Sequence, residues 1–100
     1  MDGFTILIGQ NANENDKLVR TSDPNDWWLH VSQGPSAHGV IKNPNNSKVP
    51  HKILKYCCRN IKHFNNAGKK LEFDVTKIKN VSPTDTVGRV TLRTSKQIKG

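Results

Sequence analysis

Two short stretches of the sequence carry the side chains best suited to chemistry. They are Asp26-Trp27-Trp28-Leu29-His30 and Gly34-Pro35-Ser36-Ala37-His38. A Ser near a His suggests a nucleophile and its base, but the sequence places no third group to orient the imidazole and no oxyanion donors. Two His residues do not make a zinc site either, because zinc takes about four nitrogen or sulfur ligands. We therefore expect no catalytic residue, no metal and no cofactor.

Two interpretations of these stretches remain. In the first, Trp28 belongs to the core and His30 and His38 form hydrogen bonds with loop backbone. In the second, His30, Ser36 and His38 make polar contacts with a phosphate or a base. An enzyme that acts on nucleic acid would in addition need a carboxylate cluster, and the eight scattered Asp and Glu residues supply none.

The charge of the chain indicates an anionic partner. Sixteen Lys and Arg against eight Asp and Glu give a net charge of +8. Residues 51–100 hold 12 of the basic and 3 of the acidic residues, whereas residues 1–50 hold 4 and 5. Such asymmetry favours a surface that meets phosphate, in nucleic acid or at an anionic membrane. A basic face that is merely solvated is the alternative.

The length of 100 residues predicts a single domain, 1–100. Every apolar segment is shorter than about ten residues, and the N-terminus lacks the basic and apolar regions of a signal peptide. Cys57 and Cys58 are adjacent, which excludes a disulfide framework. We expect a chain without a membrane span that works in the cytoplasm.

Alternation of apolar and polar residues predicts short strands. In the segment around Trp28, alternation puts Trp28 and His30 on one face and Leu29 and Val31 on the other. The Asn-rich segment 10–16 is interpreted as a turn, and 23–26 as a second turn with Pro24 at its second position. Strands are expected at 5–8, 18–20, 28–31, 38–42, 71–75, 89–93 and 97–99.

One helix is predicted, with Ser47 as its N-cap and its end near Gly68. Its apolar stripe is Val49, Ile53, Cys57, Ile61 and Phe64, and its basic stripe is Lys52, Lys55, Arg59 and Lys62. Because the basic stripe lies off the apolar one, reversing the charge of Lys55 and Arg59 is expected to leave the melting temperature nearly unchanged. The fold class is α+β: an antiparallel or mixed sheet of about five to six short strands with one main amphipathic helix packed on a face.

The motifs taken together resemble the NFACT-R domain family, also called DUF814. The resemblance is carried by Gly9-Gln10-Asn11-Ala12-Asn13-Glu14-Asn15-Asp16, by Asp26 with Trp28-Leu29-His30, and by Gly34-Pro35-Ser36-Ala37-His38. The chain departs from the family pattern at Gln10, where a basic residue is usual, and at Trp27 and Gly39. The family stands at the C-terminal end of ribosome quality control factors and of bacterial proteins named for fibronectin binding, and in short stand-alone proteins. It is regarded as RNA-binding, and one short metazoan relative is linked to DNA sensing.

The resemblance implies a non-catalytic nucleic-acid-binding module whose partner is RNA, either tRNA or ribosomal RNA, in translation or ribosome quality control. A protein docking module for a ribosomal or membrane-associated partner and a DNA-binding relative are the alternatives, and the oligomeric state is left open. The basic helix is expected to lie beside the His and Ser loop edge, with Trp27 exposed to stack on a base. The predicted nucleic-acid-binding residues are Asn11, Asn15, Trp27, His30, Ser36, His38, Lys52, Lys55, Arg59 and Lys62.

Overall fold

The computed structural model describes residues 3–34, 36–64 and 71–100. Its elements are β1 (Ile6–Gly9), α1 (Ala12–Thr21), β2 (Trp27–Val31), β3 (His38–Ile41), α2 (His51–Phe64), β4 (Glu72–Lys77), the 3-10 helix η1 (Ile78–Asn80), β5 (Val81–Pro83), β6 (Val90–Leu92) and β7 (Lys96–Lys99).

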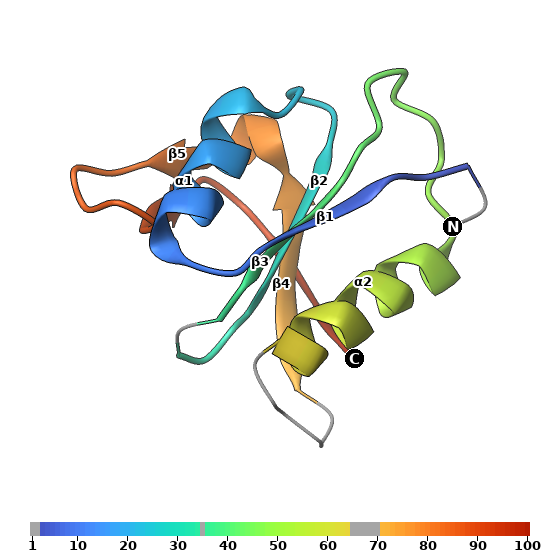
Figure 1. Ribbon diagram of the computed structural model, residues 1–100. Coiled ribbons are helices and arrows are strands. Elements are labelled where there is room, and N and C mark those ends of the chain that lie inside the picture. The colour runs from blue at the N-terminus through green and yellow to red at the C-terminus, as the bar shows by residue number, and fades with distance from the viewer. Residues whose placement is uncertain (1–2, 35, 65–70) are drawn as a thin grey trace.

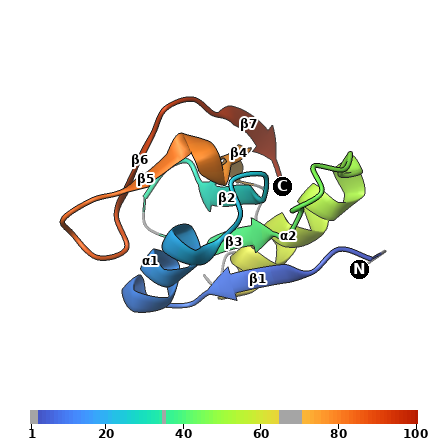
Figure 2. The same ribbon diagram turned by 90° about the horizontal axis from the view of Figure 1, so that it is seen from above.

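The main sheet has five strands in the order β1-β3-β2-β4-β7, and every neighbouring pair is antiparallel (Figure 2). β5 and β6 pair as a separate two-stranded hairpin. The predicted α+β class is confirmed, and the fold contains a second helix, α1, that the sequence patterns do not predict.

Helices cover both faces of the sheet. α2 lies on one side, and α1 with the β5–β6 hairpin lies on the other (Figure 1). The predicted alternation in β2 is confirmed, because Leu29 belongs to the core under α2 and Trp28 belongs to a second core with Val19 of α1 and Val81 of β5. A sheet buried on both faces explains why β3 has no exposed position.

α2 packs its predicted apolar stripe onto the sheet. Ile53, Cys57 and Ile61 are all fully buried. The predicted N-cap is wrong: the helix begins at His51 after Pro50, and the backbone N–H of Ser47 instead donates to Oδ1 of Asn43 at 3.0 Å. The predicted helix end near Gly68 and the side chain of Phe64 lie outside the described residues.

The segment expected to be a turn followed by a strand at 18–20 is the helix α1, and that expectation is wrong. The helix begins because Oδ1 of Asn11 accepts the backbone N–H of Glu14 at 2.9 Å, while Oε1 of Glu14 accepts the N–H of Gln10 at 2.9 Å. This is a variant of the capping box. Asp16 and Arg20, one turn apart, form an ion pair at 2.7 Å. Capping and packing of Val19 therefore outweigh the strand preference of a β-branched residue.

Asp26 fixes the start of β2 relative to the end of β3. Its side chain is fully buried and pairs with Lys42 Nζ at 2.6 Å. Its carboxylate also accepts the backbone N–H of Asn43 and, at 3.0 Å, that of Asp23. The predicted 23–26 turn is confirmed by the bond from Asp26 N to Asp23 O at 2.9 Å. This network fixes the register of β2, and with it the positions of Trp28 and His30.

Candidate nucleic-acid interface

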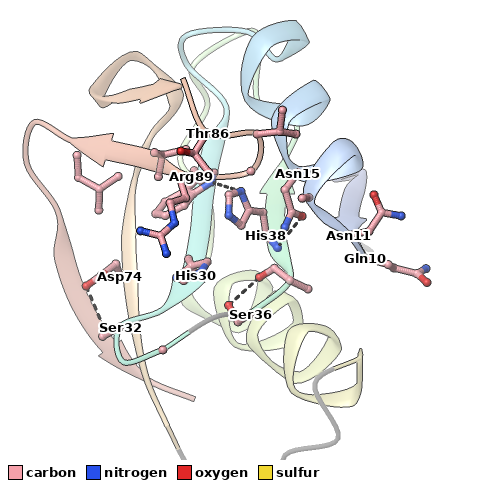
Figure 3. A pocket seen from close by; sticks show the side chains of 18 residues that line it. Gln10, Asn11, Asn15, His30, Ser32, Ser36, His38, Asp74, Thr86 and Arg89 are labelled. Atoms are coloured by element: carbon pink, nitrogen blue, oxygen red, sulfur yellow. Dashed lines mark hydrogen bonds between the residues drawn. The ribbon is translucent and has the colours of Figure 1, made fainter. Parts of the chain in front are cut away.

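A cleft of about 950 Å³ opens on the face of the sheet opposite α2 (Figure 3). Its floor comes from β2, β3 and β4, and its walls come from the start of α1 and the β5–β6 hairpin. The residues that line it are Gln10, Asn11, Ala12, Asn15, Trp28, His30, Ser32, Gly34, Ser36, Ala37, His38, Asp74, Thr86, Val87, Gly88, Arg89, Val90 and Leu92. Five of the predicted site residues thus meet in one place: Asn11, Asn15, His30, Ser36 and His38.

Three aromatic rings form the floor of the cleft. Trp28 and His30 stack with centroids 5.5 Å apart and an interplanar angle of 3°. His38 meets both rings edge-on, at 5.2 Å from Trp28 and 5.0 Å from His30. The arrangement follows from strand alternation, because β2 projects Trp28 and His30 to the same face and β3 lies beside it.

His38 is held as a neutral hydrogen-bond donor. The indole Nε1 of Trp28 donates to Nδ1 of His38 at 3.3 Å, so the proton of the neutral ring sits on Nε2. Burial lowers the pKa of His38 to about 4, and the neighbouring His30 adds to this effect. Within the described part of the chain, Nε2 forms no hydrogen bond. It is a donor available to a ligand at neutral pH.

Asn15 joins the two sequence motifs directly. Its Oδ1 accepts the backbone N–H of His38 at 3.2 Å, across 23 positions of sequence. Because Oδ1 is occupied in this way, the amide Nδ2 is the free end, and it makes no hydrogen bond to any described residue. Asn15 is only 7% exposed. A Cβ at Gly9 would lie 2.2 Å from Oδ1 of Asn15, so only glycine at position 9 leaves room for this contact.

His30 lies between the aromatic floor and a polar edge of the cleft. Asp74 of β4 is opposite it in register. Burial lowers the pKa of His30, while a hydrogen bond with the Val31 backbone and the charge of Asp74 act in the other direction. Asp74 accepts the hydroxyl of Ser32 at 2.9 Å. The edge therefore places one carboxylate, which accepts from the Ser32 hydroxyl, beside the aromatic floor.

Ser36 is engaged by backbone and not by His38. Its Oγ accepts the N–H of Val31 at 3.1 Å and donates to the carbonyl of Ala37 at 2.9 Å. These bonds fix the β2–β3 loop against the cleft. A hydroxyl so placed is a positioning group, and it has no base to activate it.

The β5–β6 hairpin also contributes to the cleft, and none of its residues is among the predicted site residues. Its tip brings Val87, 51% exposed, and the exposed Arg89 to the rim of the cleft. Gly88, with φ of +83°, packs on α1 so closely that a Cβ there would lie 2.9 Å from Cα of Ala12. Arg89 makes no ion pair with any residue the structure describes. The position of Arg89 at the rim depends on the long-range contact of Gly88 with Ala12. No local sequence pattern indicates this position.

Trp27 lies away from this cleft, and the expectation that it is exposed is wrong. It points to the α2 side of the sheet, half-buried against the core there. Lys77 Nζ lies 5.4 Å from its ring centroid. Strand alternation requires this placement, because Trp28 occupies the opposite face.

The basic stripe of α2 lies across the sheet from the cleft, not beside it. Lys52 and Arg59 are exposed. Lys55 and Lys62 are half-buried and donate to backbone: Lys55 Nζ to the carbonyl of Lys99, and Lys62 Nζ to that of Gly100 at 3.3 Å. The helix and the His and Ser residues therefore form two separate surfaces.

The described residues give little support for a metal site, a reactive thiol or a membrane span. No three His, Cys, Asp or Glu side chains gather there as a metal site. Cys57 and Cys58 are buried, and burial raises the pKa of both thiols, that of Cys58 to about 11. No helix among residues 3–34, 36–64 and 71–100 is long and apolar enough to cross a membrane.

Comparison with known proteins identifies the family. The family model described as the NFACT protein RNA binding domain matches residues 1–96. The chain belongs to this family. The residues that form the cleft all lie within the match.

Individual relatives agree with this assignment. The chain is 30% identical over 70 residues to coiled-coil domain-containing protein 25 of Danio rerio, which covers 67% of this chain and 34% of that protein. It is 30% identical over 82 residues to the Rqc2 homolog RqcH of Bacillus subtilis (strain 168), which covers 79% of this chain and 14% of RqcH. The NFACT RNA-binding domain thus spans only a minor part of these curated relatives.

A solved structure supports the fold. The C-terminal part of the fibronectin/fibrinogen-binding protein from Streptococcus suis superposes with a TM-score of 0.85 at 21% identity, over 97% of this chain and 40% of that one.

Proposed function

We propose that this NFACT RNA-binding domain binds RNA, without catalysis, by taking an unpaired nucleotide into the cleft between α1 and the β5–β6 hairpin. The observation that carries the proposal is the bond from His38 N to Asn15 Oδ1, because it gathers both family motifs around one opening. The family description names RNA as the ligand.

The chemistry of the cleft suits a nucleotide. Uncommitted donors come from His38 Nε2, Asn15 Nδ2 and the Arg89 guanidinium, and all three complement phosphate and carbonyl oxygens. Apolar surface comes from Val87, Val90 and Leu92 on the hairpin. The half-buried ring of His30 offers a stacking partner for a base, which is worth about 1 to 3 kcal/mol per base. Mixed clefts of this size are typical ligand sites.

The biological setting is part of the same proposal. Similarity to the Rqc2 homolog RqcH supports tRNA or ribosomal RNA as the ligand, in ribosome quality control and in the cytoplasm. DNA binding is the competing function, and it is an arm of the experiment below.

The experiment is a fluorescence-anisotropy titration against single-stranded RNA, tRNA and duplex DNA at two salt concentrations. If four to six phosphates are contacted, log K should fall with log salt with a slope of about −3 to −4 on single strands. A flat salt response, or a preference for duplex DNA over both RNAs, would overturn the proposal.

Two variants locate the binding site. Arg89→Ala should weaken RNA binding about tenfold or more, because it removes a charged donor from the cleft rim. Arg93→Ala is the matched control, since Arg93 is also exposed but does not line the cleft. Equal losses in both variants would mean that general charge, and not the cleft, binds RNA.

A further inference from the structure

The outer surface of α2 forms a second concentration of positive charge. We call it the α2 basic face and define it as Lys52, Lys55, Tyr56, Arg59 and Lys62. α2 contains no Asp or Glu. Lys55, Arg59 and Lys62 line a hollow of about 190 Å³ together with Gly100, at the end of the chain that Figure 1 shows beside α2.

This charge is concentrated along one side of α2. Like charges three and four positions apart destabilise a helix, and Lys52, Lys55, Arg59 and Lys62 follow at spacings of 3, 4 and 3. The ion pairs of Asp16 with Arg20 and of Asp26 with Lys42 lie elsewhere in the fold. An external anion would relieve the repulsion.

Two features make the α2 basic face more than a solvated helix. First, Lys55 and Lys62 are held in place by the backbone carbonyls of Lys99 and Gly100, so less side-chain freedom is lost when they meet a phosphate. Second, Tyr56 is exposed between the cations, one turn from both Lys52 and Arg59. An aromatic ring among cations is the arrangement that binds single-stranded nucleic acid, with the ring stacking on a base.

The sheet separates this face from the cleft. Gly39 of β3 marks the division, because its missing side chain would point at Cys57 Sγ of α2, only 2.6 Å away, whereas the neighbouring His38 faces the cleft. A short stretch of RNA bound at one surface therefore does not reach the other.

We infer that the α2 basic face is a second RNA-binding surface, and that one molecule bridges two separate RNA segments, one in the cleft and one on α2. RNA fits better than an anionic membrane, because interfacial helices insert several large apolar side chains and this face has only Tyr56. The bridging rests on the proposed function of the cleft, whereas binding at α2 stands by itself.

A capture assay tests this. One single-stranded RNA of about six nucleotides is immobilised, the protein is added, and a second labelled RNA of the same length is supplied in solution. The wild-type protein should capture the second RNA. The double variant Lys52→Glu, Arg59→Glu should reduce capture at least tenfold while its binding to one RNA in the cleft persists. Both positions are exposed, so the fold should survive.

Two controls sharpen the result. Lys17→Glu with Lys79→Glu changes the net charge equally at exposed positions outside α2 and outside the cleft lining, and it should retain capture. Tyr56→Ala should weaken capture about five- to a hundredfold through lost stacking, whereas Tyr56→Phe should restore it.

Each other outcome overturns the bridging of two RNA segments in a recognisable way. Unchanged capture in the Lys52, Arg59 variant would mean that a second copy of the chain supplies the second site. An equal loss of capture in the Lys17, Lys79 control would mean that net charge alone explains the effect of the α2 variant. If the wild-type protein bound one RNA but did not capture the second, the α2 basic face would not bind RNA and the cleft would remain as the binding site. If the Lys52, Arg59 variant lost binding to phosphatidylserine vesicles but kept RNA capture, the α2 basic face would be assigned to membranes. If Arg89→Ala changes nothing while the α2 variant abolishes all binding, the cleft proposal fails and the α2 surface stands.

Discussion

Trp28 decides the protonation chemistry of His38, because the indole N–H donates to Nδ1 at 3.3 Å and leaves Nε2 as the donor. A ring protonated on both nitrogens would break this bond and would place a charge at a site that is only 2% exposed. The core tryptophan and the cleft histidine thus form one unit. The two sequence-based interpretations of this motif, core packing and ligand contact, are compatible in the structure.

The first prediction concerns pH. The folded pKa of His38 is about 4, below the ordinary histidine value of 6.5, so between these values the unfolded chain binds a proton that the folded chain does not. Stability is therefore highest above pH 6.5 and falls as the pH is lowered toward 4, by about 3 kcal/mol from this group. Urea denaturation of the wild-type protein and His38→Gln should show a weaker pH dependence in the variant. Parallel curves would contradict the assignment.

The second prediction compares the two tryptophans. Trp28→Ala should cost about 3 to 5 kcal/mol, as for other large core truncations, and so leave a domain of ordinary stability marginal or unfolded. Trp27→Ala should cost clearly less, because Trp27 is half-buried and Trp28 is 1% exposed. Chemical denaturation measures both. A larger loss at Trp27 would show that the sheet faces are assigned the wrong way round.

Much of the fold follows from patterns visible in the sequence. Alternation around Trp28 and the four-residue spacing of Ile53, Cys57 and Ile61 predict β2 and α2 because side-chain direction repeats locally. Such patterns do not predict α1, because the Asn residues of segment 10–16 indicate a turn. The useful signal was Asn11 followed three positions later by Glu14, a capping pattern that marks a helix start.

The site could be predicted only in part. Residue type points to His30, Ser36 and His38, the family resemblance adds Asn11 and Asn15, and all five converge on the cleft. Arg89 could not be selected, because its place depends on Gly88 packing against Ala12, far away in sequence. Nor could the separation of the α2 cations from the cleft be predicted, since the face of the sheet that a helix covers is decided by tertiary packing.

The third prediction tests the close approach of β3 and α2. A Cβ at Gly39 would lie 2.6 Å from Cys57 Sγ and 2.9 Å from Ile61 Cδ1. Gly39→Ala should therefore destabilise the protein by about 1 to 3 kcal/mol through overpacking. In a Cys57→Ala background the cost should shrink, and the double-mutant cycle should give a coupling of at least about 0.5 kcal/mol. Strict additivity in denaturation experiments would argue against this contact.

The fourth prediction concerns Asp26. Asp26→Asn keeps the shape but gives up the ion pair with Lys42 and one acceptor oxygen, so we expect a loss of about 1 to 3 kcal/mol. Asp23→Asn is the matched control, because Asp23 is half-buried and its Oδ1 accepts the local N–H of Asn25, at 2.9 Å. Thermal melts should rank the two variants in this order, and the reverse order would show that the Asp26 network does not hold β2 to β3.

The last prediction separates two cations that the helical pattern alone treats as equivalent. From the sequence, charge reversal at Lys55 and at Arg59 should leave the melting temperature nearly unchanged. The structure distinguishes them, because Lys55 is half-buried and donates to the carbonyl of Lys99, whereas Arg59 is exposed. Lys55→Glu removes that donor and sets a carboxylate against a carbonyl oxygen, at a cost of about 1 kcal/mol.

In a domain of this size, that loss corresponds to a melting temperature lower by about 4 to 8 °C. Arg59→Glu should stay within about 0.5 kcal/mol of the wild-type protein, as surface substitutions usually do. Lys55→Arg should recover most of the loss by restoring a donor. Differential scanning calorimetry of the three variants tests the contact, and equal melting temperatures for Lys55→Glu and Arg59→Glu would mean that the α2 cations do not hold the end of β7.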